Sequence, residues 1–194
     1  MSPRTKFVLI FLIFSIPFVA STLVFVFWKP TASGNYGKLL SPIVLLPEVG
    51  LVAIDPGAAS KVELEKSLRG KWLMLTLERG PCEAACQKKL YAMRQSRLIL
   101  GREQDRVLRV VLLDDDVAPD DAMRQKYAGT VWISAKAQPW LKRLPTFGED
   151  GGDGKARIYG VDPLGNLFIQ YGADPDIKQM TQDFQRVLKA SQIG

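Results

Sequence analysis

The strongest constraint in the sequence is an uncharged apolar stretch near its beginning. No charged residue occurs from Phe7 to Trp28, and a helix of this length rises roughly 33 Å, enough to cross the core of a bilayer. The stretch ends at Trp28 and Lys29, an aromatic and basic boundary that is typical of a membrane interface. We therefore predict one N-terminal transmembrane helix, with residues 1–29 as the membrane anchor.

A cleaved secretory signal is the competing interpretation of this stretch. Arg4 and Lys6 supply a basic start, and Ala20 and Ser21 are small residues of the kind found at cleavage sites. The apolar run continues past them, however, which favours an uncleaved anchor. Two basic residues precede the span and Lys29 alone follows it at once, so the positive-inside rule predicts that the rest of the chain lies outside the cytoplasm.

Composition and charge exclude several classes of function for the remainder. The net charge is +6, but Lys and Arg are spread along the chain with no run of five, so we expect no nucleic-acid partner. Histidine is absent, which excludes every mechanism that needs an imidazole base or ligand. Apolar residues make up 47% of the chain, enough for the core of one domain of ordinary size.

The soluble part is predicted to have a linker and one α/β domain. Residues 30–61 are rich in Pro, Gly, Ser and Ala, and we interpret them as a linker with one or two marginal edge strands, at 39–46 and 49–54. The domain proper is expected to span residues 62–194. It opens with a nearly continuous apolar run at 71–77, which suits a central strand buried on both faces.

The elements that follow predict the order of a mixed sheet with flanking helices. Residues 82–100 favour a helix and residues 106–113 a second interior strand, which together with the first strand form a βαβ unit. After a short helix at 119–128 and an ambiguous segment at 132–144, a turn containing Pro and Gly predicts an antiparallel hairpin. The hairpin strands are 157–161 and 166–171, and the order from Lys71 onward is β-α-β-(α)-β-β-α.

The last element is predicted to be an amphipathic helix. Asp174 is the expected N-cap and Pro175 the expected first helical residue. Apolar residues then recur at spacings of three or four, at Ile177, Met180, Phe184 and Val187. We expect this apolar face to pack on the sheet.

Cys82 and Cys86 are the candidate catalytic residues. They are four positions apart at the predicted start of a helix, so both sulfur atoms can lie on one face, where they can approach each other or share a metal. Free N–H groups and the helix dipole stabilise a thiolate there. Two buried structural cysteines are the alternative. Zinc would need four ligands, whereas Cu(I) accepts two thiolates, with Met, a carboxylate or a partner's ligand completing the shell.

Two other groups of residues invite a functional interpretation that we do not prefer. Asp114, Asp115 and Asp116 end the second interior strand and could approach the cysteine pair, but capping of the following turn is the better interpretation. Trp132 and Trp140 could form a partner-facing patch, yet core packing is expected for them.

Three segments carry a resemblance to a known family. The segment 68–77, with sequence LRGKWLMLTL, is followed by GPCEAAC at 80–86, and GVDPLGNL stands at 160–167. Together with the anchor, they resemble the Sco/SenC family of membrane-anchored thioredoxin-fold proteins that assist assembly of the copper centre of cytochrome c oxidase. The family's copper histidine has no counterpart, since the corresponding stretch near Gly154 lacks it, and Gln87 replaces a family proline.

The resemblance implies a thioredoxin-like fold and a function. The chain would be an oxidase assembly factor that uses Cys82 and Cys86 for disulfide reduction or transient Cu(I) transfer. Copper is the only cofactor implied, with these two cysteines as its ligands. The partner would be a cytochrome c oxidase subunit or another periplasmic thiol protein, and the chain a single-pass protein of the bacterial inner membrane. A general membrane-tethered thiol-disulfide oxidoreductase and a non-catalytic thioredoxin-like scaffold are the alternatives.

Overall fold

The protein is described by a computed structural model covering residues 2–27, 34–46, 52–54, 68–115, 117–135, 141, 144, 157–191 and 193. The chain divides into two units, Met1–Gly34 and Asn35–Gly194. The predicted domain boundaries at 29 and 61 stay predictions.

The first unit is a single long helix, α1 (Pro3–Phe27). Its side chains are not buried against the protein, and Pro17 lies within it. The helix is long and apolar enough to cross a membrane. The predicted apolar span is therefore helical over its described part, whereas Trp28 and Lys29 lie outside the described residues.

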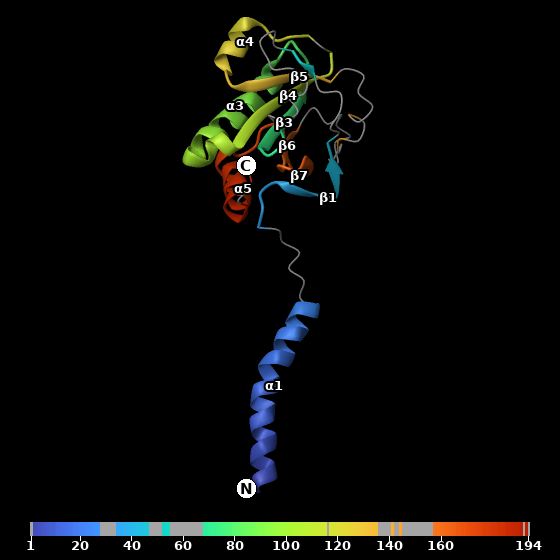
Figure 1. The fold of residues 1–194 in the computed structure, drawn as a ribbon, viewed down its shortest axis with the longest axis vertical. Coiled ribbons are helices and arrows are strands. Elements are labelled where there is room, and N and C mark those ends of the chain that lie inside the picture. The colour runs from blue at the N-terminus through green and yellow to red at the C-terminus, as the bar shows by residue number, and fades with distance from the viewer. Residues whose placement is uncertain are drawn as a thin grey trace. The chain divides into compact units, whose positions relative to one another are not determined.

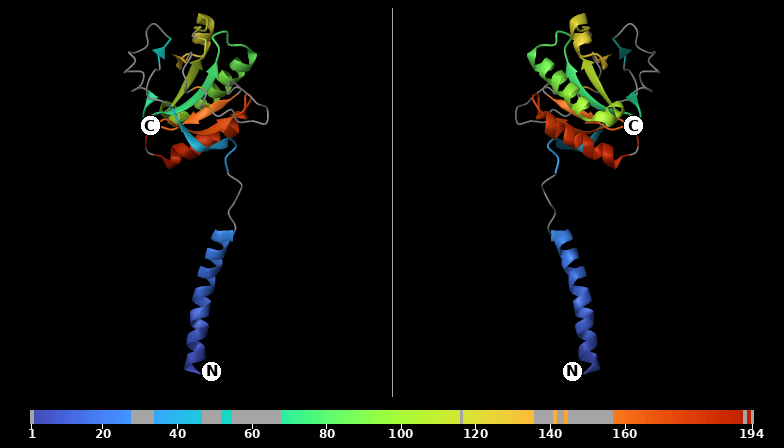
Figure 2. Two further views of the ribbon diagram at one scale, coloured as in Figure 1. Left: turned by 90° about the vertical axis from the view of Figure 1, so that its right-hand side faces the viewer. Right: turned by 90° about the vertical axis from the view of Figure 1, so that its left-hand side faces the viewer.

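The second unit is built on one mixed sheet. Its seven described strands are β1 (Lys38–Leu45), β2 (Val52–Ala53), β3 (Trp72–Glu78), β4 (Val107–Leu113), β5 (Thr130–Ser134), β6 (Ile158–Val161) and β7 (Asn166–Tyr171), in the order β1-β7-β6-β3-β4-β5-β2. The strands β3, β4 and β5 are parallel, and the other pairings are antiparallel. As Figures 1 and 2 show, β1 from the beginning of the unit lies beside β7 from near its end.

The described helices of this unit connect strands of the sheet or, in the case of α5, follow its last strand. They are α3 (Ala84–Ile99), a 3-10 helix η1 (Gly101–Arg106), α4 (Asp121–Lys126) and α5 (Ile177–Ala190). Met93 of α3 and Phe184 of α5 are fully buried and pack with Met74 of β3 on one face of the sheet. On the opposite face, Leu75 packs with Tyr159 and other buried residues. Strand β3 is buried along its whole length because apolar clusters cover both of its faces.

The structure confirms the predicted thioredoxin-like fold and the predicted order of elements, except that the order lacked one strand, β5. The predicted central strand, long helix, second strand and hairpin correspond to β3, α3, β4 and β6–β7. The two marginal strands are indeed edge strands, since β1 and β2 end the sheet on opposite sides. The ambiguous segment 132–144 contributes the end of β5, which pairs in parallel with β4.

The predicted cap of the last helix is wrong by two residues. The N-cap is Asp176, whose carboxylate accepts a hydrogen bond from the backbone N–H of Gln179 at 2.9 Å. This bond lowers the pKa of the Asp176 carboxyl. Asp174 instead lies before the helix and pairs with Lys88 at 3.3 Å, with both side chains exposed. Asp174 and Asp176 are both suited to cap a helix. The helix begins at Ile177, so Asp176 is the residue in the capping position.

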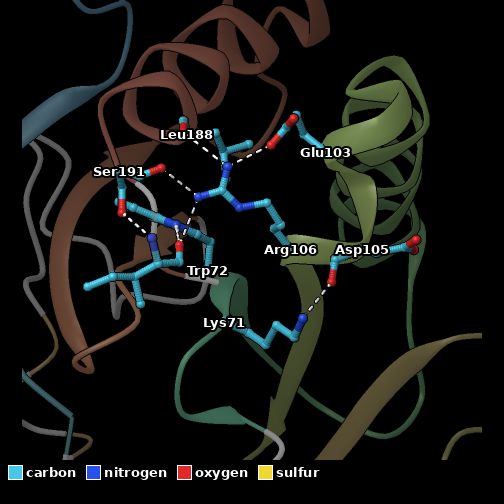
Figure 3. Close-up of polar contacts among 8 residues, drawn as sticks. Lys71, Trp72, Glu103, Asp105, Arg106, Leu188 and Ser191 are labelled. Carbon is cyan, nitrogen blue, oxygen red and sulfur yellow. Dashed lines mark hydrogen bonds and ion pairs between the residues drawn. The ribbon is translucent and has the colours of Figure 1, made fainter.

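A cluster of hydrogen bonds holds the C-terminal segment to the beginning of β3 and β4. The Arg106 guanidinium donates to the backbone oxygens of Leu188, Ser191 and Ile193 at 2.8–3.0 Å (Figure 3). It also pairs with Glu103 at 2.6 Å. The indole N–H of Trp72 donates to the same Ile193 oxygen at 3.3 Å. One cation thus satisfies carbonyl groups at and beyond the end of α5.

Candidate functional site

The two cysteines lie where the central strand leads into the first helix of the sheet. Strand β3 ends at Glu78, a turn follows, and α3 begins at Ala84. Cys86 lies in the first turn of α3, whereas Cys82 lies in the turn before it. Both were predicted at the helix start, so the prediction holds for Cys86 and is displaced by two residues for Cys82.

A disulfide joins the two sulfur atoms, and their Cα atoms are 5.3 Å apart. Cys86 is 5% exposed and belongs to a buried cluster with Leu90 and Trp132. Cys82 is half-buried and packs against the outside of this cluster. The pair therefore has one sheltered sulfur and one that solvent or a partner can reach.

The cysteines lie at the N-terminal end of α3. Its N-cap residue, Glu83, makes no side-chain capping bond. The N–H groups of the first helical turn and the helix dipole favour an anion at this end, whereas the exposed carboxylate of Glu83 acts against one. A thiolate is such an anion, so this position favours ionisation of a reduced cysteine.

The turn before Cys82 is held by a neighbouring loop. The N–H of Gly80 donates to both carboxylate oxygens of Asp115, at 3.0 and 3.1 Å, and the N–H of Val117 donates to the same group at 3.2 Å. A Cβ atom on Gly80 would lie 2.1 Å from the backbone oxygen of Val117, so only glycine fits. The interpretation of Asp115 as a turn cap is confirmed, and it also anchors the cysteine turn. Asp116 lies outside the described residues.

A buried ion pair lies directly behind the cysteines. The ammonium of Lys89, three residues after Cys86, is 2.5 Å from the carboxylate of Glu78, the last residue of β3. Both side chains are less than 10% exposed, and the hydroxyl of Thr76 also donates to Glu78 at 2.6 Å. Charges this deep are tolerated only when paired and hydrogen-bonded.

The sequence contained a signal for this pair that our prediction missed. Lys89 shares the helix face of Cys86, Leu90 and Met93, all of which are buried. A lysine on an apolar helix face and a glutamate at the end of an apolar strand each lack a solvent-facing position, which suggests that they meet. The neighbouring Lys88, by contrast, is 63% exposed.

A cavity of about 420 Å³ opens beside Cys82. One wall is the cysteine turn, with Pro81 and Glu83, and the opposite wall is the loop and first turn of α4, from Val117 to Met123. Val117 is 48% exposed here. The cavity is partly apolar, and it brings an outside group within reach of the more accessible cysteine.

The cysteines fit Cu(I) in their reduced state, although they do not complete its shell. Thiolates are the soft ligands that Cu(I) prefers, and two on adjacent turns can converge on one ion. Among the described residues no group of three His, Cys, Asp or Glu side chains is placed to hold a metal ion. The stretch near Gly154 lies outside them.

The two tryptophans contribute no surface patch that the structure describes. Trp132 is 3% exposed and packs in the cluster of Cys86, which confirms core packing. Trp140 lies outside the described residues.

Comparison with known proteins agrees with this geometry. The family model described as transmembrane-like, thioredoxin-like, C-terminal domain matches residues 72–191. No curated protein matches the chain in sequence at a significant level.

Solved structures with a similar fold include Sco proteins. Apo Sco1 from Thermus thermophilus is 16% identical, with a TM-score of 0.57, and the match covers 82% of this chain and 99% of that one. Copper-bound ScoI from Arabidopsis thaliana is 15% identical, with a TM-score of 0.53, and the match covers 80% and 99%. At such identities the likeness confirms the fold, and the resemblance to the Sco/SenC family holds at this level.

Proposed function

Because the chain belongs to the family of transmembrane-like, thioredoxin-like C-terminal domains, we propose that it is a membrane-anchored thiol protein whose Cys82–Cys86 pair cycles between disulfide and dithiol. Its role is to assist assembly of the copper centre of cytochrome c oxidase. It acts by reducing the cysteines that will hold the copper, or by passing Cu(I) to them.

The observation that carries this proposal is the unequal exposure of two bonded sulfur atoms. A disulfide between a half-buried Cys82 and a buried Cys86, at the start of a helix and beside a cavity, has the arrangement that exchange chemistry needs. One sulfur is accessible for attack on a partner, and the other is held close enough to complete the exchange.

The exchange transfers two electrons from the chain to its partner. The Cys82 thiolate attacks a partner disulfide, a mixed disulfide forms, and the partner's released sulfur takes up a proton. Cys86, after losing its proton, then attacks the Cys82 sulfur, and the second partner sulfur leaves and is protonated. The partner ends as a dithiol and the chain as a disulfide, which a separate dithiol protein must reduce before the next cycle.

Copper would be cargo carried by the same two sulfurs. Arabidopsis ScoI, which has a similar fold, has been solved with copper bound, and reduced Cys82 and Cys86 supply soft ligands of the kind that Cu(I) prefers. Because the chain has no histidine, its hold on copper is expected to suit transfer rather than storage.

The proposed location follows from the anchor. Helix α1 as a single span, with two basic residues before it, favours a domain on the periplasmic side of a bacterial inner membrane. This compartment is oxidising, so a close cysteine pair can be used in both redox states.

The test compares the full-length natural chain in detergent with the C82S and C86S variants and with the double variant. We expect a defined two-electron reduction potential, exchange with the disulfide of a peptide carrying an oxidase-type pair of cysteines, and one Cu(I) bound per reduced chain. Loss of exchange and of copper in each variant supports the proposal. Equal complementation of oxidase assembly by the double variant would contradict it.

A general thiol-disulfide oxidoreductase is the second candidate, and the cavity favours it. The cavity of about 420 Å³ gives access to the sulfur of Cys82, and exchange at that sulfur needs no metal ligand. If the reduced chain exchanges readily with unrelated disulfides and retains no Cu(I), this second function is the correct one. A scaffold role would instead leave function unchanged when both cysteines are replaced.

A further inference from the structure

A methionine lines the cavity beside Cys82. Met123 of α4 lines the same cavity as Cys82 and packs against the same buried cluster as Cys86. We propose that the thioether of Met123 is the third ligand of Cu(I) bound by reduced Cys82 and Cys86. This inference rests on the copper-carrying part of the proposed function.

Met123 differs from the other methionines that the structure describes. Met74, Met93 and Met180 are fully buried at 0% exposure in the core beneath α3 and α5. Among the described methionines, Met123 alone is partly exposed, and it lines the cavity. Burial explains the first three as core packing, whereas Met123 is only partly buried and lines the cavity.

Hydrogen bonds connect α4, which carries Met123, to α3, which carries Cys86. The hydroxyl of Tyr127 donates to the backbone oxygen of Gln87 at 3.2 Å, and Lys126 contacts the side chain of Gln87 at 3.5 Å. That side chain in turn donates to the backbone oxygen of Cys82 at 3.1 Å. Gln87 therefore links α4 to the first turn of α3 and to the backbone of Cys82.

The start of α4 is fixed at Met123 itself. The carboxylate of Asp120, the N-cap of α4, accepts a hydrogen bond from the N–H of Met123 at 2.7 Å. Asp120 also lines the cavity. The residue whose thioether is proposed to bind the metal thus has its main chain held in place before copper arrives.

The chemistry of the three sulfurs suits Cu(I). Thiolate and thioether are both soft ligands, and Cu(I) accepts low coordination numbers. A thioether is neutral, so it adds a ligand without adding to the charge of two thiolates. In a chain that has no histidine, Met123 is the available side chain of suitable softness on the cavity wall.

The test compares the full-length reduced chain with M123L in detergent. Leucine preserves volume and apolar packing but removes the sulfur. We expect copper K-edge absorption to give three sulfur neighbours in the natural chain and two in M123L. Losing a ligand should weaken Cu(I) binding, measured by chelator competition, at least as much as the roughly tenfold cost of losing an outer-shell partner. M93L, which removes a core sulfur, is the matched control and should bind as the natural chain does.

A second measurement separates ligation from packing. The reduction potential of the copper-free pair should be the same in M123L and the natural chain. If M123L binds Cu(I) with unchanged affinity and sulfur count, Met123 is not a ligand, while the thiol function stands. If the copper-free potential shifts as much as the affinity does, Met123 acts through packing and the proposal fails. If the natural chain binds no Cu(I), the proposal fails as well, and the potential and exchange data then decide the thiol function independently.

Discussion

The two ends of the central strand β3 are used in opposite ways. At its amino end, Trp72 and the nearby Arg106 donate their N–H groups to backbone oxygens of the C-terminal segment. At its carboxyl end, the polar groups form a buried ion pair between Glu78 and Lys89, and the chain then turns out to a half-buried Cys82 beside a cavity. One end is closed by hydrogen bonds, and the other has a partly accessible cysteine beside a cavity, next to the buried ion pair.

This difference indicates how one small sheet combines stability with reactivity. At the amino end, Trp72 and Arg106 satisfy backbone oxygens of the C-terminal segment, which stabilises that end. At the carboxyl end, the Glu78–Lys89 ion pair and the carboxylate of Asp115 hold the chain near the cysteines. No terminal segment is described over this end, and the cysteine turn lies at the surface. Functional groups commonly gather at this end in parallel sheets, where the strands feed into helices.

The largest expected effect comes from breaking the ion pair at the open end. We expect K89M to lower the free energy of unfolding by about 3–5 kcal/mol, because it leaves the Glu78 carboxylate buried without its cation. Urea unfolding of the full-length chain, followed by tryptophan fluorescence, measures this. The control is K88M on the same helix, whose exposed pair with Asp174 should contribute about 0–1 kcal/mol. Equal effects of the two variants would mean that burial does not distinguish them.

Filling the glycine that supports the cysteine turn should come next. We expect G80A to cost about 3 kcal/mol, at the upper end for overpacking, because its Cβ meets the backbone oxygen of Val117. The displaced loop should also change the rate at which a small alkylating reagent modifies reduced Cys82. G34A is the control, since a Cβ there meets nothing. If G80A loses stability but the alkylation rate of Cys82 is unchanged, Gly80 supports the fold without affecting the reactivity of Cys82.

Opening the closed end should have a smaller and purely structural effect. We expect R106M to cost about 2 kcal/mol, because several carbonyl groups lose a charged donor. The reduction potential of Cys82 and Cys86 should not move. A shift in that potential would show that the two ends are coupled through β3 and would weaken the contrast drawn between them.

The smallest effect concerns alkaline pH. Burial, with Asp183 nearby, raises the pKa of Tyr171 above its usual value of about 10. The folded state therefore keeps this proton while the unfolded state loses it, so the contribution to stability is full below pH 10 and declines as pH rises toward the folded pKa. At pH 11 the loss should be about 1 kcal/mol.

The alkaline decline is measured as the difference between the natural chain and Y171F in urea unfolding at pH 8 to 11. Y91F, at an exposed tyrosine, is the control and should follow the natural chain. A difference that stays constant with pH would assign the effect of Y171F to packing alone.

The local parts of the fold were predictable because their patterns are local. The apolar run of β3, the β-forming run of β4 and the Pro-Gly turn of the hairpin each contain their own signal within a few residues. The cysteine pair was found for the same reason. The cap of α5 was misplaced because Asp174 and Asp176 are locally equivalent, and only the packing of the helix on the sheet distinguishes them.

The sequence by itself determined the apolar N-terminal helix, most of the order of the strands and helices, and the place of the two cysteines between β3 and α3, since each depends on neighbours along the chain. Tertiary structure alone decided that Asp115 holds the turn at Gly80 and that Met123 shares a cavity with Cys82. These contacts join residues from different elements, and their partners are chosen by how the elements pack, which no short pattern in the chain specifies.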